Sequence, residues 1–237
     1  MPVITIEGQI GSGASELGKI VAAKLGIDFI DRLVLSQIAR RLGSITVNKL
    51  DQFETLMPSF IDRITANIEK LLARSALSGV GGDPYFGPGV EHLFSKSYYE
   101  FDEERFFLQD TFDEKQFFNT TKEVIFDVAQ SDNVVIIGRG GNIITKSIPG
   151  VLNIGLSAAI DFRKASLIKS EGVNDKSALE MIAHADRAQK VYFSKAFNES
   201  PTDPVHYHVM FNTKIVDIEK ISDCIAMIVK ARQAKIK

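Results

Sequence analysis

Apolar residues follow two alternating patterns along the chain, short continuous runs and longer segments with helical spacing. The runs are rich in β-branched residues and predict strands at VITIE (3–7), IDFID (27–31), NVVIIG (133–138), VLNIGL (151–156) and YHVMFNT (207–213). A period near 3.6 predicts helices over residues 15–25, 32–42, 113–130, 158–170, 176–196 and 218–232. Apolar strands that alternate with helices predict an α/β fold with a mostly parallel central sheet covered on both faces.

The middle of the chain departs from this alternation. The spacing stays helical from residue 46 to residue 77, and the stretch SGVGGDPYFGPG (78–89) is too rich in Gly and Pro for either helix or strand. The stretch from 91 to 109 is aromatic and charged and gives no clear element. We therefore expect a single domain over residues 1–237 that contains a divergent helical region at 45–130.

Composition narrows the class of protein. The 237 residues are 45% hydrophobic and 24% charged, with a formal net charge of -2, which gives no reason to expect a nucleic-acid or membrane-surface partner. The single cysteine, Cys224, excludes an internal disulfide framework. No signal-peptide pattern and no apolar run long enough to span a bilayer are found. These features predict a cytoplasmic globular protein.

The clearest chemical signal is the stretch GQIGSGAS, residues 8–15, between the first predicted strand and helix. Its spacing is that of a P-loop, G-x-x-x-x-G-K-[ST], except that Ala14 replaces the lysine. Most of such a phosphate cradle is main chain, so it survives without the lysine, and Ser15 stands where a hydroxyl would bind Mg²⁺. The alternative is a tight strand-to-helix turn that binds nothing.

Several stretches resemble the cytidylate kinase-like family. The run ITIEGQIGSGASELGKIVAAKLGIDFIDR looks like the start of that family, whose members also tend to carry a small residue after GSG. VVIIGRGGNII (134–144) is similar to its strand followed by Gly-Arg, DFRKASL (161–167) to its Arg-bearing helix, and ADRAQKVYFSKAF with YHVMFNT to its lid and last strand. The resemblance implies a P-loop three-layer α/β/α fold with a helical acceptor region and a lid at 174–205.

The resemblance also implies roles for individual residues. ATP would be held by Gly8, Gly11, Ser12, Gly13, Ala14 and Ser15, with Ser15 as a ligand of Mg²⁺. Asp31 and Arg139 would bind the acceptor, and Arg163, Arg187 and Lys190 would supply positive charge to the transferring phosphoryl group. Each has a structural alternative: a helix cap for Asp31, an ion pair or cap for Arg139, and solvated charges on amphipathic helices for Arg163 and Arg187.

Four positions depart from the family's pattern: Ala14, Asn142, Gln189 and His208. Two functions therefore remain open. The first is a kinase that transfers the γ-phosphoryl group of ATP to a nucleoside monophosphate, such as CMP. The second is a nucleotide-binding regulatory or interaction protein with little or no turnover. In the second case, the glycine loop and aromatic cluster of the middle region are a candidate surface for a partner or a homodimer.

Overall fold

The computed structural model describes residues 2–31 and 114–234, which form one sheet with helices on both faces. The strands are β1 (Val3–Gly8), β2 (Asp28–Ile30), β3 (Val134–Ile137), β4 (Leu152–Ser157) and β5 (Val209–Asn212). Their order is β2-β3-β1-β4-β5, and all four neighbouring pairs are parallel. The predicted α/β class with a mostly parallel sheet is confirmed.

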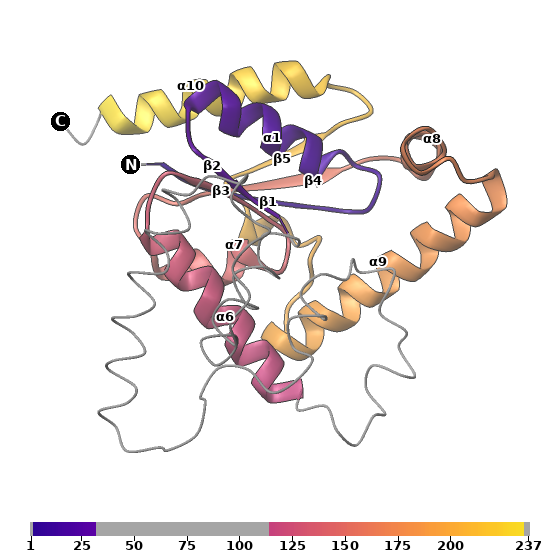
Figure 1. Cartoon of the computed structure of the whole chain (residues 1–237), viewed down its shortest axis with the longest axis horizontal. Helices are drawn as coiled ribbons and strands as arrows, with labels where there is room; N and C mark the ends of the chain where they lie inside the picture. The colour runs from indigo at the N-terminus through magenta and orange to yellow at the C-terminus, as the bar shows by residue number, and fades with distance from the viewer. Residues whose placement is uncertain (1, 32–113, 235–237) are drawn as a thin grey trace, which may run out of the picture.

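The helices form two layers around this sheet (Figure 1). The first layer contains α1 (Ala14–Leu25) and α10 (Ile218–Ala234), which pack against each other, and the second contains α6 (Glu114–Gln130) and the short α7 (Gly141–Ile144). Helices α8 (Ile160–Glu171) and α9 (Asp175–Phe197) follow β4 and pack against each other beyond its carboxyl end. The 3-10 helices η2 (Thr145–Ser147) and η3 (Pro204–His206) complete the described elements.

The core explains why β1 occupies the centre of the sheet. Residues 3–7 of β1 are all buried, because a strand with parallel neighbours on both edges and a helical layer on both faces has no solvent side. Ile4 and Ile6 of β1 pack in one cluster with Leu17 of α1 and with Ile221 and Ile225 of α10. The strand that leads into the glycine loop at 8–15 is therefore packed on every side.

The predicted strands and helices within the described residues are all present, with ends shifted by one or two residues. The helices expected at 32–42 and 46–77, the glycine-rich stretch at 78–89, the segment 91–109 and most of region 45–130 lie outside the described residues. The pattern gave no signal for α7, η2 or η3, because elements of three or four residues do not complete enough turns to show a period.

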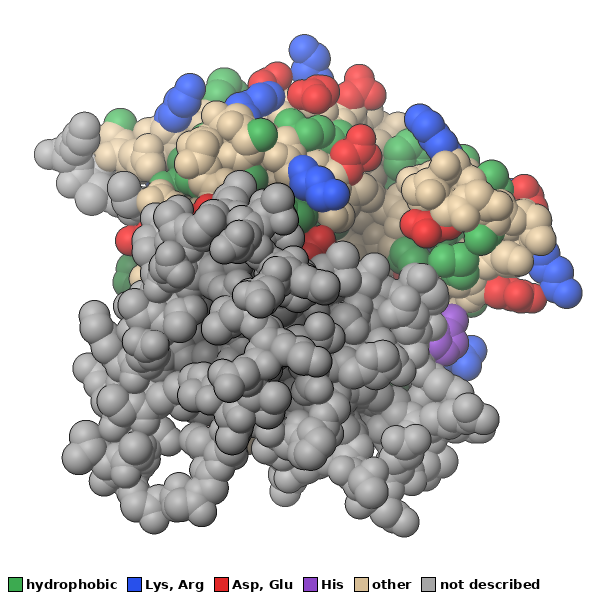
Figure 2. All heavy atoms as spheres, in the orientation of Figure 1, with side chains coloured by type: hydrophobic (Ala, Val, Ile, Leu, Met, Phe, Trp, Pro, Cys, Tyr) green, Lys and Arg blue, Asp and Glu red, His purple; other side chains and the backbone are tan. Residues whose placement is uncertain are grey.

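No helix within the described ranges is long and apolar enough to cross a membrane. The face shown in Figure 2 carries Lys and Arg interspersed with Asp and Glu over its upper part, above α1 and α10, and neither sign forms a broad patch there. This distribution is consistent with the formal net charge of -2.

Candidate functional site

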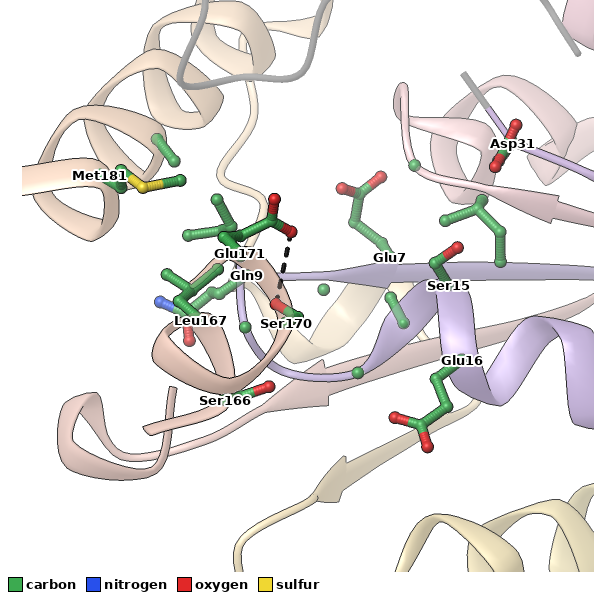
Figure 3. A pocket seen from close by; sticks show the side chains of 18 of the residues that line it. Glu7, Gln9, Ser15, Glu16, Asp31, Ser166, Leu167, Ser170, Glu171 and Met181 are labelled. Carbon is green, nitrogen blue, oxygen red and sulfur yellow. Dashed lines mark hydrogen bonds between the residues drawn. The ribbon is translucent and has the colours of Figure 1, made fainter. Parts of the chain in front are cut away.

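A cavity of about 460 Å³ lies beyond the carboxyl ends of β1 and β3. In parallel α/β sheets, ligands bind at this edge, because loops and helix N-termini converge there. One wall is residues 7–11 and 13–16, at the end of β1 and the start of α1; the opposite walls come from the loop after β3 and from α8 and α9. Figure 3 shows Glu7, Ser15 and Asp31 on one side and Ser166, Ser170 and Glu171 on the other.

The loop between β1 and α1 has the backbone of a phosphate cradle. Gly11 and Gly13 adopt φ values of 76° and 86°, a left-handed conformation that residues with a Cβ rarely adopt. Gly13 is the N-cap of α1, and no side chain caps the helix there. The first N–H groups of α1 therefore have no acceptor on the N-cap side chain. They lie at the N-terminal end of the helix, where the helix dipole favours an anion.

The close packing of this loop explains its three glycines. A Cβ on Gly8 would lie 2.6 Å from Ser12 Oγ, and one on Gly11 would lie 2.6 Å from the carbonyl oxygen of Arg163. A Cβ on Gly13 would lie 2.6 Å from Cδ1 of Ile218. The loop is thus enclosed between its own turn, α8 and α10, so its shape is fixed before any ligand binds.

A second left-handed turn faces the loop across the cavity. Gly138, Arg139 and Gly140 have φ values of 74°, 59° and 70°, and Arg139 is the non-glycine residue among them. Holding an arginine in this conformation costs about 1–2 kcal/mol. The Tyr192 hydroxyl stabilises the turn by donating a 3.1 Å hydrogen bond to the carbonyl of Arg139. Arg139 is buried and lines the cavity.

Glu7, the last side chain before the glycine loop, connects three elements. Its carboxylate accepts a 3.1 Å hydrogen bond from the backbone N–H of Gly140 and a 2.7 Å bond from Nε2 of Gln189 on α9. Burial raises the pKa of Glu7 from its ordinary value of 4.5 to about 7, although both hydrogen bonds and the charge of Arg139 oppose the rise. The carboxyl group therefore changes protonation near neutral pH inside the cavity wall.

Glu7→Gln is expected to remove part of the pH dependence of stability. Because the folded-state pKa of Glu7 is above the unfolded value, its favourable contribution is complete below pH 4.5 and is lost as the pH rises through 7. The lost contribution is about 3 kcal/mol for a shift of this size. Glutamine has no proton to lose, so the variant should show a flatter curve when its free energy of unfolding is measured by urea denaturation from pH 5 to pH 8.

Glu16→Gln is the matched control, because Glu16 also lines the cavity but is exposed in the first turn of α1. The free energy of unfolding of Glu16→Gln, plotted against pH, should run parallel to that of the unmodified protein. Parallel curves for Glu7→Gln and the unmodified protein would contradict the assignment of the titration to Glu7.

The predicted site residues divide into two groups. Gly8, Gly11, Gly13, Ala14, Ser15, Asp31 and Arg139 all line the cavity. Ser12 is buried within the loop and does not line the cavity. Arg187 and Lys190 are exposed on α9, and neither lines the cavity in this arrangement.

Arg163 connects the walls of the cavity instead of facing into it. Its guanidinium makes two 2.8 Å hydrogen bonds to the carboxylate of Asp186 on α9. A third, of 3.4 Å, goes to the carbonyl of Ile10 in the phosphate loop. Arg163 is 2% exposed, so these contacts hold α8, α9 and the loop together. The geometry supports a positioning role for this residue, and a direct catalytic role stays a prediction.

Sequence reasoning missed Glu7 and the role of Gln189. Glu7 is a charged residue at the end of an otherwise apolar strand, directly before the glycines, and that was the available signal. Gln189 was noted only as a departure from the family's pattern, yet its amide is the donor that pairs with the Glu7 carboxylate. A hydrogen bond between residues 182 positions apart leaves no trace in a single sequence.

Comparison with known proteins identifies what the chain is similar to. A model of the cytidylate kinase-like family matches residues 3–215. The crystal structure of an uncharacterized protein from Eubacterium ventriosum is 18% identical, with a TM-score of 0.59 and coverage of 97% of this chain and 98% of that chain. No curated protein matches the chain.

Two kinases are among the solved structures that match. Shikimate kinase from Bacteroides thetaiotaomicron is 17% identical over 96% of this chain and 98% of that chain, with a TM-score of 0.47. A gluconokinase from Sinorhizobium meliloti is 14% identical over 99% of this chain and 93% of that chain, with a TM-score of 0.45. The family match, the sheet order and the glycine loop together confirm the predicted P-loop kinase-like fold.

Proposed function

The chain belongs to the cytidylate kinase-like family, and on that premise we propose that it transfers the γ-phosphoryl group of ATP to a nucleoside monophosphate such as CMP. The observation that carries the proposal is the facing pair of left-handed turns in one cavity. The glycine loop at 8–15 presents an uncapped helix N-terminus, and Arg139 lies on the opposite turn. Phosphoryl transfer needs this kind of arrangement, with two phosphate-binding groups that position donor and acceptor.

The donor side fits the triphosphate of ATP. Gly8, Gly11 and Gly13 leave the space that a Cβ would fill, and the N–H groups at the start of α1 would bind phosphate oxygens. The cation that Ala14 does not supply must come from elsewhere. In this proposal it comes from Arg187 and Lys190, when the lid closes over the phosphates.

The same wall fits Mg²⁺ as a partner of the phosphates. Ser15, Glu16 and Asp31 present hard oxygen atoms to the cavity, which are the ligands Mg²⁺ prefers. No group of three or more His, Cys, Asp or Glu side chains that could hold a metal alone occurs within residues 2–31 and 114–234. Mg²⁺ bound to Ser15 together with phosphate and water would neutralise charge on the transferring group.

The acceptor side is assigned to Arg139. A guanidinium binds phosphate oxygens through two parallel hydrogen bonds, and Arg139 is buried in the cavity wall opposite the glycine loop. Asp31, at the carboxyl end of β2, would contact the remainder of the acceptor. A monophosphate oxygen is already anionic, so no general base is required. The proposed lid at 174–205 includes α9, and its closure would bring Arg187 and Lys190 to the phosphates.

Arg139→Ala is expected to reduce kcat/KM for the acceptor about 100-fold or more, because the preorganised charge that binds the acceptor phosphate is lost. ATP binding should change by less than about threefold, because the backbone of the glycine loop is untouched. Steady-state kinetics give the first value, and fluorescence titration with an ATP analogue gives the second.

Arg139→Lys is the matched variant, because it keeps the charge and loses the planar fork. Its activity should fall between those of Arg139→Ala and the unmodified protein. An equal loss of donor and acceptor binding in Arg139→Ala would overturn the assignment of Arg139 to the acceptor.

The proposed activity is tested by coupled ATP turnover with Mg²⁺ against a panel of nucleoside monophosphates. Turnover that depends on one acceptor would support the proposal and identify the substrate. Shikimate and gluconate belong in the same panel, because a hydroxyl acceptor would retain the kinase class and replace the monophosphate.

A regulatory nucleotide-binding protein is the second candidate, and the charges of the cavity favour it. Among the described residues that line the cavity, Glu7, Glu16, Asp31 and Glu171 carry carboxyl groups, and Arg139 alone carries a cationic side chain. A cavity with more carboxyl groups than cationic side chains stabilises a transferring phosphoryl group less strongly than a cation-rich site does. Thermal stabilisation by ATP without turnover of any acceptor would support this candidate.

A further inference from the structure

A second cavity lies at the opposite edge of the sheet from the phosphate loop. Its volume is about 570 Å³, which is within the range of small-molecule sites. Val151 directly precedes β4 and His208 directly precedes β5, so the cavity lies at the amino ends of these strands. Because the sheet is parallel, the phosphate loop lies at the other edge. We call this second site the amino-end cavity.

The amino-end cavity is lined by cations and by no carboxylate among the described residues. Lys146 of η2 and Arg232 near the end of α10 line it, together with His206 and His208. Neither Lys146 nor Arg232 forms an ion pair within the described ranges. Arg232 donates one 3.1 Å hydrogen bond to the carbonyl of Val151, which fixes its guanidinium at the wall.

The histidines add directed polar atoms to this charge. Nδ1 of His208 accepts a 2.9 Å hydrogen bond from the backbone N–H of Asn153, so the proton of the neutral ring is on Nε2. Burial and the nearby charge of Arg232 lower the pKa of His208. His206 is 8% exposed, and its Nε2 lies 3.2 Å from the carboxylate of Glu199. Its Nδ1 is buried without a hydrogen-bond partner in the described structure.

An unpartnered buried polar atom costs about 1–3 kcal/mol, so native proteins satisfy such atoms with water or a ligand. The wall also has apolar parts, Ile148, Pro149 and Val205, against which the body of a small molecule would pack. From this combination of size, cationic groups and apolar wall, we propose that the amino-end cavity binds a small organic anion that carries a phosphate or several carboxylates. This proposal does not rest on the proposed kinase activity.

The test is calorimetric titration of the full chain with inorganic pyrophosphate in one arm and citrate in the other. Lys146→Glu should weaken binding at the amino-end cavity about tenfold or more, because an attraction becomes a repulsion next to the anion. Lys220→Glu is the control, since it makes the same charge change at an exposed position near the start of α10 that does not line the cavity. It should change affinity less than about twofold.

Pyrophosphate would also bind at the glycine loop, so the titration is repeated in Gly11→Ala, in which the shape of that loop is disrupted. Binding that persists in Gly11→Ala and is lost in Lys146→Glu supports the proposal. If Gly11→Ala does not fold, Ser15→Glu takes its place, because it puts a negative charge at an exposed position of the same loop that does not line the amino-end cavity. Preference for pyrophosphate or for citrate then identifies a phosphate or a carboxylate ligand. Three results would overturn the proposal. They are absence of binding in both arms, complete loss of binding in Gly11→Ala, and equal effects of Lys146→Glu and Lys220→Glu on affinity.

Discussion

Gly11→Ala is expected to weaken ATP binding about 100-fold or more, because the phosphate loop must leave its present shape. Two effects combine at this position. The φ of 76° disfavours any residue with a Cβ, and the added Cβ would lie 2.6 Å from the backbone carbonyl oxygen of Arg163. A backbone atom of α8 cannot rotate away as a side chain would. The loop has to shift, and each charge-assisted hydrogen bond lost to a phosphate costs about 1.5–3 kcal/mol.

The measurement is equilibrium binding of ATP with Mg²⁺, with circular dichroism to confirm that the variant is folded. Gly26→Ala is the matched control, because Gly26 also adopts a left-handed conformation, with φ of 64°, and an added Cβ would meet nothing within 4 Å. Gly26→Ala should lose about 1–2 kcal/mol of stability from the left-handed φ alone and keep its ATP affinity. Unchanged ATP binding in Gly11→Ala would show that the loop is not the donor site.

Arg163→Ala is expected to reduce the free energy of unfolding by about 3 kcal/mol, because it leaves the carboxylate of Asp186 without its buried partner. The guanidinium is 2% exposed, whereas the Asp186 side chain is 23% exposed, which places the value at the lower end of the range for buried pairs. The variant also loses the 3.4 Å contact to the phosphate loop at Ile10. Urea denaturation at pH 7 measures the effect.

Lys164→Ala provides the control for this experiment. Lys164 forms a 2.5 Å ion pair with Asp175, in which the aspartate side chain is 71% exposed, so its removal should cost much less stability than removal of Arg163. The double variant Arg163→Met/Asp186→Leu should recover much of the stability lost in Arg163→Ala, because an apolar pair removes the uncompensated charge. A loss in Arg163→Ala no greater than in Lys164→Ala would contradict the positioning role. A catalytic role would instead appear as a lower kcat in Arg163→Lys at unchanged stability.

The candidate site was partly predictable from the sequence. The glycine loop was found from its spacing and its place directly after an apolar strand, and Arg139 from the resemblance of its stretch to the family. The structure brings both together, because the carboxyl ends of parallel strands meet at one edge of the sheet. Helix residues were harder to assign. Arg163, Arg187 and Lys190 lie on two helices, and the direction of each side chain depends on how its helix is rotated and packed, which a single sequence does not specify.

By itself, the sequence determined the parallel α/β architecture and the glycine loop between β1 and α1, because hydrophobic periodicity and glycine spacing are local properties of the chain. Only the tertiary structure decided which polar and charged side chains lie next to one another. It placed Gln189 beside Glu7, Asp186 beside Arg163, and Lys146 and Arg232 around one cavity. Burial and the distances between remote segments control electrostatic energies, and both arise only when the layers pack together.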